Sequence, residues 1–458
     1  MSAPSGIYRI AGASGFWGDR NDALLDQVRG GPLDAVMLDY LAEITMSILR
    51  VKRMRDPQQG YAGDFLKALD PALEAIAERG VRVVSNAGGI HPRACAEAVV
   101  ALARKHGIRG LAVGLVTGDD LFERLDELTA RGVALEHFDT GAAFSTVRER
   151  VLSANAYLGA EPIARVLRQG AQVVVTGRCT DSALALGPLL ARYAWPDDDW
   201  DRRAAGVVAG HLLECGGQAS GGNYSGGWEE VPDLANLGYP IAEVEESGAF
   251  AVTKHPGLGG RITPAVLKEQ LLYEIGDPRA YLTPDVAADF TSIRLEDLGG
   301  DRVRVSGVRG APPPEDLKVS MSYQDGWTNA VALTFVWPHA LERARASERL
   351  LRERCEKLGL EIDDWHVDRI GVDGAHGPMA PPPAGEPNEV LLRVAIRTRD
   401  RDSAKRFGQE VAPLVLSGVP GACSGLLTGR PEPRAIVNYW PTRVPRAEVR
   451  AQVEILES

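Results

Sequence analysis

The chain has 458 residues, of which 45% are hydrophobic and 25% are charged, proportions typical of a soluble globular protein with two domains. Its 62 acidic and 51 basic residues give a formal charge of −11, which excludes a general nucleic-acid binder because such proteins need a basic surface. The first residues lack a signal-peptide pattern, no apolar stretch is long enough to span a membrane, and the five cysteines contain no CxxC pair. We therefore expect a cytoplasmic protein without membrane or nucleic-acid partners.

Five short apolar runs in the first 190 residues each end in a cluster of small or polar residues. The runs are 7–11, 35–38, 81–84, 111–116 and 173–175. Segments between them, such as 64–77 and 94–105, carry apolar residues three and four positions apart, the spacing of an amphipathic helix. Strands that alternate with helices predict a mostly parallel sheet with helices on both faces. Because ligands of such sheets bind beyond the carboxyl ends of the strands, the polar clusters should line one site.

The second half of the chain has a different character. Residues 201–282 are glycine-rich and less regular, and from about residue 290 the apolar residues alternate with polar ones, as in half-buried antiparallel strands. Helices are predicted over 339–357 and 403–416. The fold class expected is therefore α/β, with a mostly parallel sheet and flanking helices over residues 1–285 and a second, α+β domain over 286–458.

Two carboxylates, Asp39 and Glu43, follow the second apolar run. If a helical turn follows the strand, residues four apart face the same way. Paired carboxylates shift one another's pKa and can supply an acid and a base to one pocket. The alternative is that Asp39 caps a helix and Glu43 is solvated.

The third and fifth strand ends carry groups suited to substrate binding. Asn86 can hydrogen-bond a carbonyl or hydroxyl, and Gly88 lets a ligand approach the backbone. Arg178 presents a forked cation that suits a carboxylate or phosphate. Asp181 is either an acid or base of the site or the N-cap of the next helix. Cys179 is expected to be buried in packing rather than reactive.

The segment 211–227 contains three Gly-Gly pairs at five-residue intervals, which no ordinary helix or strand would tolerate. A loop that surrounds a ligand explains this composition, with Gln218, Asn223 and Ser225 as binding groups. No GK[ST] sequence is present, so a nucleotide cofactor is not indicated. His211 and Glu214 could ligate a metal on one helical turn, but a third ligand is missing, so a metal is possible but not favoured. Glu214 is instead a candidate general acid or base.

A second glycine-rich segment, 254–261, precedes a helix that should start at Thr263 with a proline in its first turn. A loop of this kind ahead of a helix is a ready anion site. Lys254, His255 and Arg261 would then form the cationic pocket that an acidic protein needs for an anionic substrate. The alternative is a solvated basic loop.

Six segments taken together resemble the acyclic terpene utilisation (AtuA) family, formerly a domain of unknown function. They are 39–43 (DYLAE), 85–89 (SNAGG), 174–182 (VVTGRCTDS), 211–218 (HLLECGGQ), 221–225 (GGNYS) and 253–256 (TKHP). The resemblance runs from about residue 8 to about residue 439. It implies an intracellular protein of acyl-CoA catabolism, in the degradation of branched acyclic terpenoids, and family members resemble lyases or hydratases of CoA thioesters. Longer members carry a further C-terminal ferredoxin-like domain, and we expect this chain to end before one.

We therefore expect a lyase or hydratase that acts on a branched or hydroxylated acyl-CoA, with a homo-oligomeric assembly as for many cytosolic enzymes. Its acid and base groups would come from four carboxylates: Asp39, Glu43, Asp181 and Glu214. Two alternatives remain, a non-catalytic binding subunit of an acyl-CoA carboxylase complex and a metal-dependent hydrolase.

Overall fold

The computed structural model describes residues 6–423 and 431–458, and the chain divides into two compact units. The first unit comprises Met1–Ser322 and Tyr439–Ser458, and the second comprises Tyr323–Asn438. The sequence placed the boundary at 285/286, where the alternating pattern begins. The difference arises because strands β11 (Arg294–Asp297) and β12 (Val303–Ser306) extend the main sheet of the first unit through pairing of β12 with β8.

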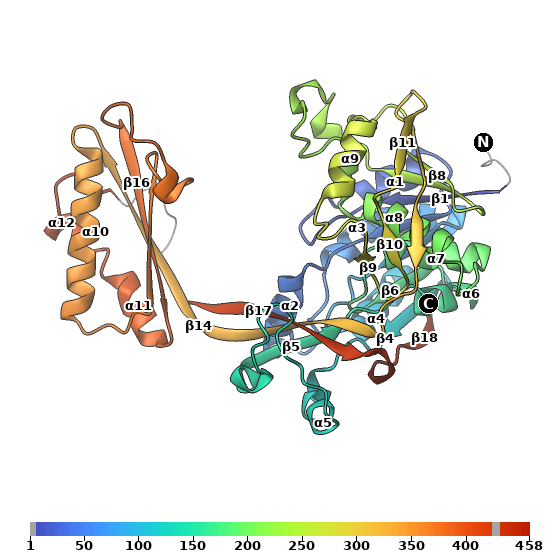
Figure 1. The fold of residues 1–458 in the computed structure, drawn as a ribbon, viewed down its shortest axis with the longest axis horizontal. Helices are drawn as coiled ribbons and strands as arrows, with labels where there is room; N and C mark the ends of the chain where they lie inside the picture. The colour runs from blue at the N-terminus through green and yellow to red at the C-terminus, as the bar shows by residue number, and fades with distance from the viewer. Residues whose placement is uncertain (1–5, 424–430) are drawn as a thin grey trace. The chain divides into compact units, whose positions relative to one another are not determined.

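The first unit is built on a ten-stranded sheet of the order β11-β12-β8-β7-β1-β2-β3-β6-β4-β18 (Figure 1). Its five central strands are parallel: β1 (Ile7–Gly12), β2 (Ala35–Leu38), β3 (Arg82–Ser85), β6 (Val173–Thr176) and β4 (Ala112–Thr117). Antiparallel strands complete both edges: β7 (Ile241–Glu245) and β8 (Phe250–Thr253) on one side and β18 (Gln452–Glu457) on the other. The predicted α/β class is confirmed.

Helices cover both faces of the parallel strands, which explains why these strands are continuous apolar runs. On one face, Val83 and Val175 pack with α1 (Ala23–Gly30), α3 (Asp64–Arg79) and α4 (Pro92–Lys105). On the other face, Val84 and Val174 pack with α6 (Glu161–Arg168), α7 (Ala183–Tyr193) and α8 (Trp200–Glu214). Successive strand residues therefore serve opposite cores, and a polar residue within a strand would be buried.

Three further regions of the first unit surround the carboxyl ends of the strands. Helix α2 (Glu43–Arg55) follows β2 and contacts β5 (Val151–Ala156). Helix α9 (Pro264–Leu272) begins as predicted, because the Thr263 hydroxyl accepts a hydrogen bond from the Val266 amide. The short strands β9 (Tyr281–Leu282), β10 (Ala287–Asp289) and β13 (Arg309–Ala311) form a small sheet that packs beside α8.

Helix α8 lies in the region that the sequence indicated as irregular. Its glycines make the sequence look irregular, but they are needed for packing. A side chain at Gly210 would lie 2.7 Å from the backbone of Ser182. The small residues thus allow α8 to pack closely against the start of α7.

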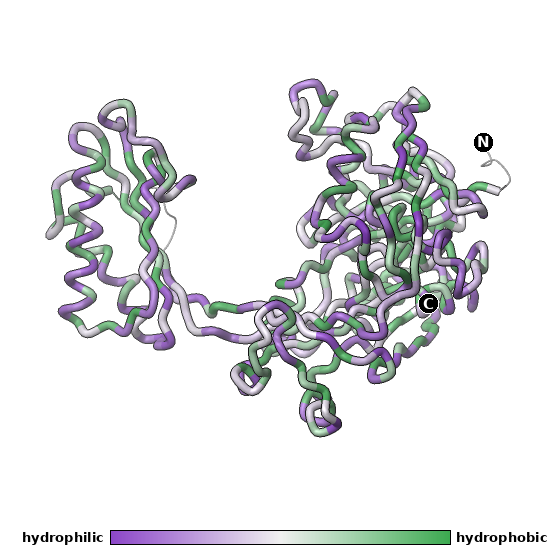
Figure 2. Tube along the Cα trace, in the orientation of Figure 1, coloured by the Kyte–Doolittle hydropathy of each residue, from purple (hydrophilic) through white to green (hydrophobic). Residues whose placement is uncertain are grey.

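The second unit has the chain order βαββαβ of ferredoxin-like folds, so the expectation that the chain ends before such a domain is wrong. Its elements are β14 (Asp316–Val336), α10 (Ala340–Lys357), β15 (Asp364–Ile370), β16 (Glu389–Thr398), α11 (Arg401–Gln409) and β17 (Arg434–Pro445), with strand order β15-β16-β14-β17. Hydrophilic and hydrophobic residues alternate along α10, whose apolar face packs on β16 (Figure 2). The second domain is therefore α+β, as expected. Among the described residues, no helix combines the length and the apolar character needed to cross a bilayer.

Candidate active site

Four parallel strands end in loops that meet at one edge of the sheet. Asp39 follows β2, Asn86 follows β3, Asp119 follows β4 and Arg178 follows β6. We call these loops and the side chains that contact them the strand-end cluster. A side chain at Gly88 would lie 2.5 Å from the carbonyl oxygen of Thr176, so the loops after β3 and β6 touch through their backbones. Gly88 thus allows close packing between loops, whereas the sequence analysis assigned its space to a ligand.

Asp39 is held in place by hydrogen bonds within the strand-end cluster. Its Oδ1 accepts from Asn86 Nδ2 at 2.7 Å and from the Leu41 amide at 3.0 Å, while Asn86 Oδ1 accepts from the Tyr40 amide at 2.8 Å. Asn86 is fully buried. Its side-chain amide, which was predicted to bind substrate, instead positions Asp39. Burial, with the negative charge of Asp181, raises the pKa of Asp39 well above its usual range against the opposing effect of Arg178.

Arg178 is the central cation of the cluster and is only 2% exposed. Its Nη1 donates to the Leu41 carbonyl and to Asp181 Oδ1, the latter at 3.1 Å, and its guanidinium lies 4.3 Å from the ring centroid of Tyr157. Its Nε has no hydrogen-bond partner among the described residues. Asp181 therefore pairs with Arg178, and helix α7 begins after Ser182 without a side-chain cap, so the N-cap interpretation of Asp181 is not found.

Glu43 opens helix α2 and is half-buried on the other side of Tyr157. The Tyr157 hydroxyl donates to Glu43 Oε1 at 2.9 Å, and Lys318 Nζ lies 3.6 Å from the same oxygen. Burial alone would raise the pKa of Glu43, but Arg178, followed by Lys318 and the Tyr157 hydroxyl, outweighs burial and lowers it. Asp39 lies ahead of the helix, so the two carboxylates do not share a helical face. Their pKa values nevertheless shift in opposite directions beside the same arginine.

The carboxyl end of α8 brings Glu214 to the cluster. A side chain at Gly12 would lie 2.6 Å from the Leu213 carbonyl oxygen, and one at Gly15 would lie 2.7 Å from the Cys215 carbonyl carbon, so the helix end rests on bare backbone after β1. Burial raises the pKa of Glu214 to about 7 against the opposing effect of His211, and Asp181 raises it further. Glu214 thus interacts electrostatically with Asp181 of the strand-end cluster.

Several buried polar atoms of this region have no hydrogen-bond partner among the described residues. They are Arg178 Nε, Thr180 Oγ1, Ser182 Oγ, His211 Nε2 and Glu214 Oε2. A buried polar atom without a partner costs free energy, so proteins rarely leave several of them together. Three of these atoms belong to the loop after β6 and two to the last turn of α8, the elements that carry Arg178 and Glu214.

The glycine-rich segment packs over α9 and connects to α8 through glutamines. Gln218 Nε2 donates to Gln270 Oε1 at 2.9 Å, and Gln270 Nε2 donates to the His211 carbonyl at 2.9 Å. Asn223 Nδ2 lies 3.5 Å from Gln218 Oε1. Ser225 donates through its amide and hydroxyl to Glu269, both at 3.0 Å. Gln218 is therefore linked to the His211 turn, while Asn223 and Ser225 are bonded within the segment and to α9.

The three basic residues of segment 254–261 do not join the strand-end cluster. Lys254 Nζ donates to the Leu258 carbonyl at 2.9 Å and pairs with Asp301 at 3.1 Å. Arg261 pairs with the exposed Glu230 at 3.2 Å. Their charges are thus neutralised locally by carboxylates that the sequence pattern did not connect with them.

His255 of the same segment is buried against helix α1. Its Nε2 lies 2.9 Å from the Gln27 carbonyl oxygen, and its ring occupies the space beside Gly30. Burial lowers the pKa of His255, which favours a neutral packing residue over a cation. The expected cationic pocket of Lys254, His255 and Arg261 is therefore not formed.

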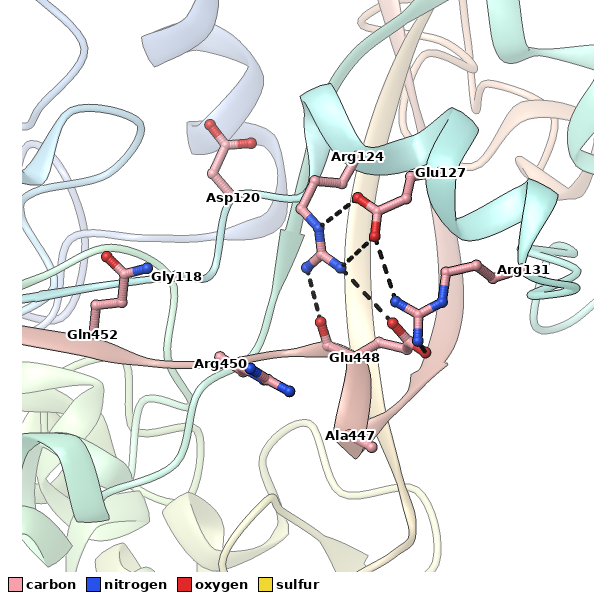
Figure 3. A pocket seen from close by; sticks show the side chains of 9 residues that line it. All are labelled: Gly118, Asp120, Arg124, Glu127, Arg131, Ala447, Glu448, Arg450 and Gln452. Atoms are coloured by element: carbon pink, nitrogen blue, oxygen red, sulfur yellow. Dashed lines mark hydrogen bonds and ion pairs between the residues drawn. The ribbon is translucent and has the colours of Figure 1, made fainter.

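A separate cavity of about 480 Å³ lies between the β4–α5 region and the C-terminal segment (Figure 3). Helix α5 spans Leu125–Ala130. Arg124 and Arg131 in this cavity are already paired with Glu127 and Glu448, at 2.9 to 3.7 Å. None of the residues predicted for the site lines it. Its paired charges join α5 to the C-terminal segment.

The structure adds two residues that the sequence analysis did not select. Asp119 Oδ2 accepts from the Arg178 amide and from Asn155 Nδ2, both at 2.8 Å, and burial raises its pKa to about 7. Its signal was its place after the fourth apolar run. Tyr157, which lies between Arg178 and Glu43, had no such signal because it follows β5, outside the parallel sheet.

A metal site would need at least three suitable side chains together. Within residues 6–423 and 431–458, no group of three or more His, Cys, Asp or Glu side chains is arranged to hold a metal ion. His211 Nδ1 is instead 2.8 Å from Glu214 Oε1, a distance at which the two side chains hydrogen-bond each other.

Comparison with curated proteins and with solved structures found no match. The family model described as acyclic terpene utilisation family protein AtuA matches residues 8–455, which is nearly the whole chain. The protein therefore belongs to the AtuA family, whose role is in acyclic terpene utilisation.

Proposed function

We propose that the protein is a lyase or hydratase that acts on a branched or hydroxylated acyl-CoA thioester during acyclic terpenoid catabolism. Family membership supports the metabolic setting. The observation that carries the chemistry is the buried Arg178, whose Nε has no hydrogen-bond partner among the described residues and whose guanidinium lies on the Tyr157 ring that hydrogen-bonds Glu43. A buried donor near a carboxylate is what acid–base chemistry next to a carbonyl group needs.

The proposed reaction needs a base for the proton next to the thioester carbonyl, an acid for the leaving oxygen and a donor that polarises the carbonyl. Glu43 is the base in this scheme, because its lowered pKa keeps it ionised at neutral pH. Arg178 Nε is the donor, since it is buried and has no protein partner among the described residues. A dehydration then moves the proton from the α-carbon to Glu43, and the hydroxyl leaves as water after it accepts a proton.

Asp39 has a supporting part in this scheme. Its Oδ1 accepts hydrogen bonds from Asn86 and from the Leu41 amide. These bonds hold the loop whose Leu41 carbonyl accepts a hydrogen bond from Arg178. Asp181 holds the guanidinium from the opposite side. Both are positioning residues, and the proton donor has to be another group.

The test is turnover by the purified chain alone. Saturated, 3-hydroxylated and 2,3-unsaturated CoA esters are incubated with the protein, and the absorbance of the conjugated thioester is followed. We expect interconversion of the hydroxylated and unsaturated esters, and its loss in Glu43→Gln. Binding of esters without turnover, together with capture of an acyl-CoA carboxylase, would contradict the proposal and favour a non-catalytic subunit.

A further inference from the structure

The last turn of α8 carries a buried histidine–glutamate pair. His211 Nδ1 and Glu214 Oε1 are 2.8 Å apart, and the two side chains are only 1% and 8% exposed. Each side chain keeps one polar atom, His211 Nε2 and Glu214 Oε2, without a hydrogen-bond partner among the described residues. A buried ionisable pair is expensive to desolvate, and leaving both outer atoms unpaired adds to that cost. Packing alone gives no reason for such an arrangement.

The two members of the pair differ in their surroundings. The His211 ring lies against the rings of Tyr281 and Phe290, with centroids 5.6 Å and 5.7 Å away. Glu214 is the member that interacts electrostatically with Asp181 of the strand-end cluster. Glu214 is therefore the member that is coupled to the strand-end cluster, while His211 contacts two aromatic rings.

The position of the pair is fixed by backbone contacts. Gln270 of α9 donates to the His211 carbonyl at 2.9 Å, and the bare backbone at Gly12 supports Leu213 from the side of β1. The charged and titratable groups that face the pair come from several elements. They are Asp181 after β6, Cys215 after α8, Tyr273 and Glu274 after α9, and Tyr281 of β9.

We propose that His211 and Glu214 act as one unit that stores a proton for the site, which Glu214 Oε2 delivers to the leaving oxygen of the substrate. The identity of the leaving oxygen rests on the proposed function. In the resting pair the His211 imidazole holds its own proton on Nδ1 and donates it in a hydrogen bond to Glu214 Oε1, while the stored proton is on Glu214 Oε2. When Oε2 gives the proton away, the leaving hydroxyl departs as water, and Glu214 remains as a carboxylate that accepts a hydrogen bond from Nδ1–H. The proton taken up by Glu43 later returns to the pair through solvent.

His211 is a positioning residue in this account, because it acts on the substrate only through Glu214. Burial raises the pKa of Glu214 to about 7, while the positive charge of His211 opposes that rise. Removing the charge of His211 should therefore move the pKa of Glu214 upward. An asparagine at position 211 keeps a neutral donor at the place of Nδ1 but cannot carry the charge.

The experiment is an infrared difference titration of the whole protein without substrate. We expect a carboxylic-acid C=O band that titrates near pH 7, is lost in Glu214→Gln, and in His211→Asn titrates at a higher pH. Other buried carboxyls, such as Asp119 and Asp285, contribute bands that remain in Glu214→Gln. His106→Asn is the matched control, because His106 pairs with Asp70 and Glu74 outside the cluster, and it should leave the Glu214 band unchanged.

Two outcomes would overturn the proposal that the pair stores a proton. One is an infrared spectrum that is the same in Glu214→Gln as in the wild type, and the other is a band whose titration midpoint is the same in His211→Asn. If that variant fails to fold, the imidazole nitrogen resonances of the wild-type protein decide, because the pair requires the proton on Nδ1. Resonances of His211 that show the proton only on Nε2 would contradict the proposed pair. A band that behaves as expected in a protein that turns over no CoA ester would instead overturn the proposed function and the delivery step.

Discussion

Two regions of the first unit were expected to bind an anionic substrate, and the structure separates them clearly. In the strand-end cluster, Arg178 is buried, stacks on Tyr157 and keeps its Nε free of protein partners among the described residues. In segment 254–261, Lys254 and Arg261 each pair with a nearby carboxylate. The difference teaches that a basic residue in a loop indicates a binding site only if some of its hydrogen-bond donors have no partner within the protein. Variants of the two regions should therefore behave differently.

The largest effect is expected for Arg178. Arg178→Lys keeps the charge but removes the forked donor, so we expect the rate to fall by about 10²- to 10³-fold, as when one donor to a developing charge is lost. Arg178→Met leaves three carboxylates without their cation and should cost about 3–5 kcal/mol of unfolding free energy. Steady-state kinetics and urea unfolding measure the two quantities. Wild-type rates in Arg178→Lys would contradict the role given to the cluster.

Asp119 tests the electrostatics of the cluster through its effect on stability. Its folded-state pKa of about 7 lies above the ordinary value of 3.8, so its favourable contribution is complete below about pH 3.8 and is lost as the pH rises through about 7. Asp119→Asn does not titrate and can still accept hydrogen bonds. We expect its unfolding free energy to gain on the wild type between about pH 4 and pH 8, by roughly 3–4 kcal/mol at most. A pH-independent difference would show that Asp119 is ionised throughout.

His255 separates stability from activity in the other region. His255→Ala removes a ring packed against α1 and leaves the Gln27 carbonyl without its partner, so we expect a loss of about 2–4 kcal/mol of unfolding free energy. The turnover number at a temperature where the variant is folded should remain that of the wild type. A fall in turnover comparable with that of Arg178→Lys would return segment 254–261 to the site.

Arg261 should show the smallest effect. Its ion pair with Glu230 is largely exposed to solvent, and such pairs contribute about 0.2–1 kcal/mol. Arg261→Gln should therefore change thermal stability little and leave the KM for CoA esters unchanged. A clear rise in KM would indicate that an anionic part of the substrate reaches this loop.

That residues after the parallel strands lie together could be predicted from the sequence, because it follows from topology. Asp39, Arg178 and Asp181 come together because each follows a parallel strand, and all such strands end at one edge of the sheet. The partners of these residues could not be predicted, because hydrogen bonds depend on distances that a strand pattern does not contain. Asn86 was expected to bind substrate but holds Asp39, and Tyr157 gave no signal because β5 lies outside the parallel strands.

The prediction of the domain boundary was limited in the same way, because the strand pattern does not contain the pairing of the strands. The residues of β11 and β12 were correctly interpreted as strands, and in β12 buried and exposed residues alternate as the pattern predicted. Alternation does not say which sheet a strand joins, and β12 pairs with β8 at the edge of the first unit. Helix α8 was missed because its glycines, which permit contact with α7, lower its apparent helical propensity.

The contact of Gly12 and Gly15 with the end of α8 has a consequence for how this protein can diversify. At these two positions the end of the helix meets a loop without side chains, so no rotamer at position 12 or 15 alters its placement. Lineages can therefore exchange the side chains of the strand-end cluster while the end of α8, with Glu214, keeps its place beside the loop after β1. Changes in the side chains of the cluster and preservation of this helix contact then fall on different residues.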